Sequence, residues 1–116
     1  MKDNIRKYLF DIKESIQSIF SYLGDSRNFK KYEENKQLRR AVEREFEIIG
    51  EAVNIILKIS PDVPIDSARK IVDLRNWVIH AYDSVDNVII WGIIIKDLPK
   101  LLEEVDKLLS AYKEGM

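Results

Sequence analysis

The sequence is poor in the residues that build most recognisable catalytic sites. Among its 116 residues there is no cysteine, one histidine, four glycines and three prolines. Without cysteine the chain cannot form a disulfide framework or a thiolate metal site, and one histidine leaves a metal hydrolase without its usual ligands. Neither a glycine-rich phosphate loop nor the strand–turn–helix of serine hydrolases occurs. These absences exclude disulfide-stapled domains and argue against metal hydrolases, P-loop enzymes and serine hydrolases.

Long hydrophobic runs are also missing. The longest apolar run, residues 88–95, has eight residues, whereas about 20 are needed to span a bilayer. The charged start, Met1–Asn4, leads into an amphipathic segment and does not resemble the core of a signal peptide. We therefore expect a soluble, cytoplasmic protein that does not enter a membrane.

The charges nearly cancel over the whole chain but are unevenly distributed. The formal net charge is −1, so no global field attracts nucleic acid. Residues 27–44 nevertheless contain seven bases and three acids (+4), whereas residues 81–116 contain four bases and seven acids (−3). The basic stretch is either a solvated helix face or a surface that follows a phosphate backbone. The sequence leaves both interpretations open.

Apolar residues recur at steps of three and four through the first half of the chain, which predicts amphipathic helices around a common core. We expect a first helix capped by Asp3 or Asn4 and stopped at Gly24, and a second from about Asn35 to Ile59. The predicted core positions are Ile5, Tyr8, Leu9, Ile12, Ile16, Ile19, Phe20 and Leu23, then Leu38, Val42, Phe46 (or Glu45), Ile49, Val53, Ile56 and Leu57.

Polar segments separate these helices from the next one. The connector at 25–35 can hold a short helical turn, and two prolines break the chain in a loop at 60–65. Asp66 or Ser67 is expected to cap a third helix. Its apolar positions are Ile71, Leu74 and Val78, with His80 near its end.

The last third of the chain predicts two more helices. A polar turn at 83–87 precedes an isoleucine-rich fourth helix, which is apolar nearly all round and so should be central or lie against a partner subunit. Asp97 and Pro99 mark a restart or kink before a final helix. No alternation of period two competes. We therefore expect a single all-α domain, residues 1–116, folded as an antiparallel bundle of four to five helices.

Candidate catalytic residues are concentrated in the third predicted helix, at Arg75, Asn76, His80 and Tyr82. Histidine exchanges protons near neutral pH, and the planar, permanent cation of arginine suits phosphate. Cleavage of RNA by its own 2′-hydroxyl needs a proton acceptor, a proton donor and a cation that stabilises the charged phosphorane. His80 and Arg75 match these needs. Asn76 can bind a phosphate oxygen or orient His80, and Tyr82 can contact phosphate or a base.

An ideal helix does not place Arg75 and His80 on one face. Five residues turn the helix by about 500°, which leaves the two side chains roughly 140° apart. The helix can loosen near the turn at 83–87, the ligand can run along a groove and touch both residues, or a twofold axis can bring copies from two subunits together. By itself R-x4-H is a weak motif, because an arginine and a histidine at this spacing are common.

The surrounding residues make the motif more specific. The run Arg75-Asn76-x3-His80-x-Tyr82-Asp83 resembles the R-x4-H-x-Y signature of HepT-like toxins of the HEPN superfamily. The segment Arg44–Ala52 resembles that family's second helix, which typically ends in I-G-E-A. Trp91 followed by Asp97-Leu98-Pro99-x-Leu101 is similar to its final helices. Lengths and order agree over nearly the whole chain.

The resemblance implies a HEPN-like bundle that dimerises with both motifs at a shared cleft. It implies a metal-independent endoribonuclease toxin, acting on RNA without a cofactor and paired with a small nucleotidyltransferase antitoxin. Arg75 and His80 become catalytic and Asn76 assists. Tyr82 becomes the site at which the antitoxin adds AMP from ATP.

Two other functions remain open. The bundle could be a non-catalytic subunit that binds nucleotide or docks a nucleotidyltransferase, with the motif as its pocket. It could also be a structural helical dimer. A purified protein that leaves RNA intact but binds ATP or its partner tightly would favour the non-catalytic subunit. Motif residues that lie far from any cleft would favour the structural dimer.

Overall fold

The computed structural model describes residues 3–25, 27–65, 67, 69–73 and 87–114. Its named helices are α1 (Asp3–Leu23), α2 (Phe29–Glu34), α3 (Lys36–Ile59), α5 (Asn87–Gly92), the π-helical segment η1 (Ile93–Asp97) and α6 (Leu98–Glu114). Ser67 and residues 69–73 are also helical. Every regular element among the described residues is a helix, so the all-α fold class is confirmed.

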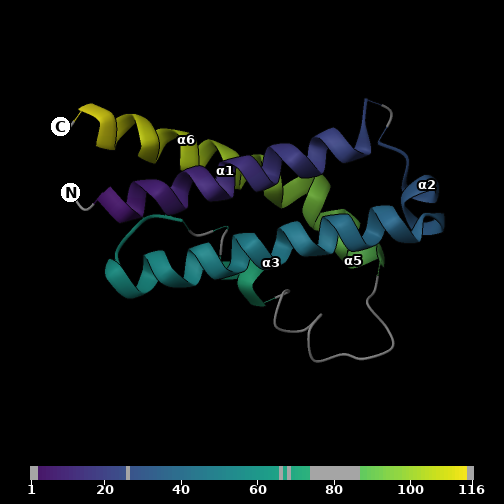
Figure 1. Ribbon diagram of the computed structural model, residues 1–116, viewed down its shortest axis with the longest axis horizontal. Helices are drawn as coiled ribbons and strands as arrows, with labels where there is room; N and C mark the ends of the chain where they lie inside the picture. The colour runs from purple at the N-terminus through teal and green to yellow at the C-terminus, as the bar shows by residue number, and fades with distance from the viewer. Residues whose placement is uncertain (1–2, 26, 66, 68, 74–86, 115–116) are drawn as a thin grey trace.

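Three long helices lie side by side (Figure 1). α1 runs away from the end of the molecule that holds both termini, and α3 and α6 run back toward it. The short helix α2 lies at the opposite end, where the chain turns from α1 to α3. The antiparallel arrangement of the predicted bundle is therefore present.

Local sequence signals explain where the first helices end and begin. Gly24 adopts φ +70 and its N–H donates to the carbonyl of Phe20 at 3.1 Å, which closes α1 in the way glycine favours. Asn28 and Asn35 cap α2 and α3, since their side chains accept hydrogen bonds from backbone N–H groups three residues later. The short helix in the connector, the second long helix and the 60–65 loop are confirmed.

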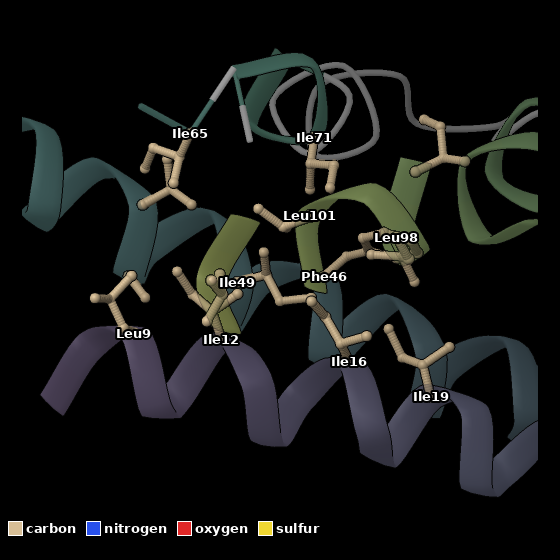
Figure 2. Close-up of a cluster of buried hydrophobic side chains, with 14 of the residues drawn as sticks. Leu9, Ile12, Ile16, Ile19, Phe46, Ile49, Ile65, Ile71, Leu98 and Leu101 are labelled. Carbon is tan, nitrogen blue, oxygen red and sulfur yellow. The ribbon is translucent and has the colours of Figure 1, made fainter. Parts of the chain in front are cut away.

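The core is aliphatic and its positions follow the predicted stripes. Figure 2 shows α1 on one side of the buried cluster and the segment with Ile65 and Ile71 on the other. Phe46, not Glu45, is the buried alternative on α3. The fully covered side chains include Leu9, Ile12, Ile16, Ile19, Ile49, Ile56, Ile65, Ile71, Ile90, Ile94, Leu98, Leu101 and Tyr32.

One detail of the prediction is wrong: Asp3 and Asn4 both lie inside α1 and not ahead of it as a cap. The predicted restart or kink at Asp97 and Pro99 coincides with a change of helix type: the π-helical segment η1 ends at Asp97 and α6 begins at Leu98. The backbone stays helical on both sides, since Gly92 and Leu98 both have right-handed helical φ and ψ angles. Pro99 fits the first turn of the following α-helix, where a missing N–H costs little.

The isoleucine-rich segment is only partly central. Ile90, Ile93 and Ile94 are buried, but Val88, Ile89 and Ile95 are 64%, 45% and 40% exposed. The monomer therefore covers one face of α5 and η1 and leaves apolar side chains on another.

Candidate active site

The four predicted site residues, Arg75, Asn76, His80 and Tyr82, lie outside the described residues, as do Leu74 and Val78. Their roles therefore stay predictions. The structure does describe the two pieces of chain that lead into and out of this segment, which end at Asp73 and begin again at Asn87.

The chain enters the segment from a stretch that is fastened to the core. Ile65 and Ile71 are 1% and 0% exposed, and both point toward the buried cluster (Figure 2). Burying such side chains stabilises a fold by about 1.5–3 kcal/mol each. The helical residues just before the motif are thus held in place, although they are separated from α3 by a loop.

Two polar contacts fasten the same stretch to the last helices. Ser67 Oγ donates a hydrogen bond to Glu104 Oε2 at 3.1 Å, and Lys70 Nζ lies 3.5 Å from Asp97 Oδ1. The side chain of Asp97 is only 12% exposed, whereas that of Lys70 is 67% exposed. Asp97 and Glu104 are seven residues apart, or two helical turns, which suits side chains on one face. Asp97 and Glu104 therefore contact Lys70 and Ser67, in the stretch of chain that precedes Arg75.

The chain leaves the segment through α5, which is held by aromatic contacts. The ring centroids of Phe29 and Tyr32 lie 5.7 and 5.5 Å from that of Trp91. Ile90, next to Trp91, is buried. α2 is thereby packed against the helix that directly follows the motif.

A π-helical turn links α5 to α6. Ile93, Ile94 and Asp97 of η1 are buried, and Asp97 is the residue that pairs with Lys70. Single π-helical turns inside longer helices occur often at functional sites, because the extra residue redirects neighbouring side chains. Here the π-helical turn ends at the carboxylate that holds the stretch leading into the motif.

The aromatic contact of α2 with α5 lies beside perturbed ionisable groups. Burial raises the pKa of Tyr32, with the Glu43 carboxylate adding to the rise and Arg39 opposing it. Burial also raises the pKa of Glu43, against the attraction of Arg39 and Arg40. Among the described residues, the buried Tyr32 hydroxyl has no hydrogen-bond partner. The Tyr32 hydroxyl and the Glu43 carboxyl are therefore both poorly solvated.

The described residues offer no clear metal site and no membrane-spanning segment. They contain no group of three or more His, Asp or Glu side chains that could hold a metal ion. None of their helices combines the length and apolar character needed to cross a bilayer.

The groove between α1 and α3 is acidic. Its lining includes four acids, Asp11, Glu14, Glu45 and Glu51, with Ile48 between them. The hydroxyl of Tyr22 donates a hydrogen bond to Glu45 Oε2 across it at 2.7 Å, and this bond raises the pKa of Tyr22. Its charge suits neither phosphate nor RNA.

Comparison with known proteins identifies the family. Residues 12–108 match the family described as "Ribonuclease HepT-like". The chain belongs to the HepT-like family. The match covers most of the chain and includes all four predicted site residues, so the resemblance inferred from the sequence is confirmed.

HepT-like relatives include archaeal proteins of similar length. "Putative RNase MJ1380" of Methanocaldococcus jannaschii is 35% identical over 90% of this chain and 96% of its own length. "Probable ribonuclease HepT" of Thermococcus cleftensis is 33% identical over 93% of this chain and 98% of its own. No solved structure matches the chain.

The sequence does not predict the contacts that hold the stretch before the motif. It predicts a restart or kink at Asp97 and a cap at Ser67, whereas the structure pairs these residues with Lys70 and Glu104. Carboxylates at Asp97 and Glu104, seven residues apart among buried leucines, are the signal that could have revealed these anchors.

Proposed function

We propose that this HepT-like chain is a metal-independent endoribonuclease in which Arg75 and His80 carry out the cleavage. The family match, which spans residues 12–108 and so both residues, is the observation that carries the proposal. The R-x4-H-x-Y pattern supplies the chemistry that such a reaction needs, and the buried, anchored flanks described above support a fixed site.

The reaction needs only groups that the motif provides. The ribose 2′-oxygen bonds to the adjacent phosphorus while its proton passes to a base, and the bond from phosphorus to the 5′-oxygen breaks as that oxygen gains a proton. Histidine ordinarily has a pKa near 6.5, so the imidazole of His80 can take the 2′-hydroxyl proton and then return it to the leaving 5′-oxygen. The guanidinium of Arg75 stabilises the charged phosphorane. Asn76 assists by binding a phosphate oxygen or orienting His80.

We further propose that the chain is a toxin, controlled by a small nucleotidyltransferase acting as its antitoxin. In this proposal the Tyr82 oxygen attacks the α-phosphorus of ATP, pyrophosphate leaves, and AMP stays bound to the tyrosine. The added group brings bulk and a negative phosphate within two residues of His80. Both repel an incoming RNA backbone.

A homodimer completes this proposal, since Arg75 and His80 do not share a face of one ideal helix. The exposed apolar residues Val88, Ile89 and Ile95 lie on the helix that follows the motif and support a contact with a second copy. A twofold axis there would place two motif segments near each other.

An RNA cleavage assay in EDTA tests the catalytic assignment. The parent should cut RNA without added metal, and His80→Ala and Arg75→Ala should lose roughly 100-fold or more in rate. Arg69→Ala is the matched control, because Arg69 is an exposed arginine six residues before Arg75, and it should cleave like the parent. A folded His80→Ala protein with parental activity contradicts the proposal. Intact RNA together with tight ATP binding would instead favour the non-catalytic subunit.

Co-expression with a nucleotidyltransferase tests the toxin–antitoxin part. The parent should arrest growth alone, and the partner should relieve the arrest while adding one or more AMP masses at Tyr82. Tyr82→Phe should stay toxic beside the partner. Modification of exposed Tyr22 instead, with relief retained in Tyr82→Phe, would show that Tyr82 is not the target.

A further inference from the structure

The basic residues of α2 and of the first turns of α3 have no role in the function proposed so far. We infer that this basic surface, defined as Lys30, Lys31, Lys36, Arg40 and Arg44, binds the phosphate backbone of the RNA substrate outside the cleavage site. The inference rests on the proposed ribonuclease function and adds to it the place where the rest of the strand is held.

The cations of this surface are exposed and available. All five residues are exposed, and Lys30, Lys31 and Lys36 form no ion pair within the described part of the chain. Residues 27–44 keep a balance of +4 after Glu33, Glu34 and Glu43 are subtracted. Exposed lysines without carboxylate partners are the groups that exchange counterions for phosphate most readily.

The fold brings this surface to the helix that follows the motif. Phe29 and Tyr32, on either side of Lys30 and Lys31 in the sequence, both contact Trp91 of α5. Trp91 lies four residues, or about 6 Å of helix, after Asn87. Five residues of chain, which reach at most about 18 Å, connect Asn87 to Tyr82. A strand bound at the motif therefore needs to extend only a short way to reach the lysines.

The groove between α1 and α3 does not compete for phosphate. It is lined by Asp11, Glu14, Glu45 and Glu51, and Lys7, near it, pairs with Asp11 at 3.9 Å. Electrostatic repulsion thus directs RNA away from this groove, whereas the basic surface attracts it.

A pair of triple variants tests the inference. The first replaces Lys30, Lys31 and Lys36 by glutamine. The second replaces Lys7, Lys58 and Lys107, which lie on α1, α3 and α6, by glutamine. Lys58 is 22 residues from Lys36 on α3, about 33 Å along the helix. Each variant removes three positive charges, and circular dichroism checks that each is folded.

Binding of a fluorescein-labelled single-stranded RNA of about 20 nucleotides is measured over a series of salt concentrations. Every protein in this binding assay also has the His80→Ala substitution, so that the RNA is not cleaved. The first triple variant should lower the slope of log affinity against log salt by about 2, or about 0.7 for each lost contact. Its Kd should rise on the order of tenfold or more near 0.1 M salt. In the active protein its KM should rise while kcat stays unchanged.

The outcomes separate this inference from the proposed function. If RNA is cleaved and His80→Ala abolishes cleavage, but both triple variants bind RNA equally well, the basic surface is not a binding site and the catalytic proposal stands. If the parent neither binds nor cleaves RNA, the ribonuclease proposal itself fails and this inference fails with it.

Discussion

At the scale of single residues, the side chains near Trp91 include buried polar groups that lower the stability of the fold. The Tyr32 hydroxyl is fully covered and finds no hydrogen-bond partner in the part of the chain that the structure describes, and Glu43 is half-buried. A buried polar atom that makes no hydrogen bond loses its hydration and gains nothing in return. Tyr32 is therefore retained for its ring, which packs against Trp91, and not for its hydroxyl.

Tyr32→Phe should leave stability unchanged or raise it by about 1 kcal/mol, because the substitution removes an unpaired hydroxyl and keeps the ring. Urea denaturation gives the free energy of unfolding. Tyr22→Phe is the contrasting control: its hydroxyl donates to Glu45 at 2.7 Å on the surface, so this change should cause a small loss. A loss of more than about 1 kcal/mol in Tyr32→Phe would mean that the hydroxyl has a partner after all.

Glu43→Gln should be slightly more stable than the parent at pH 7, by less than about 1 kcal/mol because solvent screens a half-buried charge. The pKa of Glu43 is raised in the fold by burial. Stability contributed by this group is therefore greatest below its unfolded pKa and falls as pH rises through the folded value. The difference between variant and parent should close as the pH is lowered toward 4.5, its ordinary value. A constant difference from pH 4 to pH 8 would contradict this.

At the scale of elements, the helices were predictable because their signals are local. Asn35 and Gly24 correctly predicted the start of α3 and the end of α1, and the apolar stripes predicted the buried faces. Each of these signals acts over only three or four residues. The π-helical turn before Leu98 was not predictable, since its residues Ile93, Ile94 and Asp97 are buried and Asp97 pairs with Lys70, 27 residues earlier in the chain. The anchors of the motif are long-range too: Ser67 and Glu104 are 37 residues apart. Sequence periodicity contains no information about such pairs.

Ser67→Ala should destabilise the fold by about 1–3 kcal/mol. The substitution leaves Glu104 without its hydrogen bond, and the other carboxylate oxygen of Glu104 is already buried without a partner. Thermal denaturation measures the loss, and Ser110→Ala at an exposed site of α6 should change stability by less than about 0.5 kcal/mol. Because Ser67 lies only eight residues before Arg75 in the sequence, RNA cleavage should fall as well. Parental stability in Ser67→Ala would show that this contact does not hold the stretch.

At the scale of the whole molecule, charge and apolar surface are segregated. The basic surface lies at the α2 end, acids line the groove between α1 and α3, and α5 and η1, which follow the motif in the sequence, expose Val88, Ile89 and Ile95. The sequence predicted the uneven charge but not its relation to the motif, because the contact of α2 with α5 is tertiary. The catalytic roles of Arg75 and His80 stay predictions. In the proposed dimer, the exposed apolar faces of two copies would lie against each other.

Replacing Ile89 and Ile95 by lysine should convert the proposed dimer to a monomer and reduce RNA cleavage at least tenfold. Both side chains are partly exposed in the monomer, so the change should leave the fold intact while placing charges in a contact between copies. Sedimentation velocity at micromolar concentration distinguishes the two states. Phe10, exposed on α1, offers the control Phe10→Lys, which should stay dimeric. A parent that sediments only as a monomer would rule out a site built from two copies.

The most direct measurement is the chemistry at the two new RNA ends after cleavage in EDTA. Attack by the neighbouring 2′-hydroxyl, assisted by His80 and Arg75, should leave a 2′,3′-cyclic phosphate on one fragment and a 5′-hydroxyl on the other. A single 2′-deoxy nucleotide at the cleaved position should abolish the cut. Ends carrying a 5′-phosphate and a 3′-hydroxyl, or cleavage that persists at the deoxy position, would contradict catalysis by this histidine and arginine.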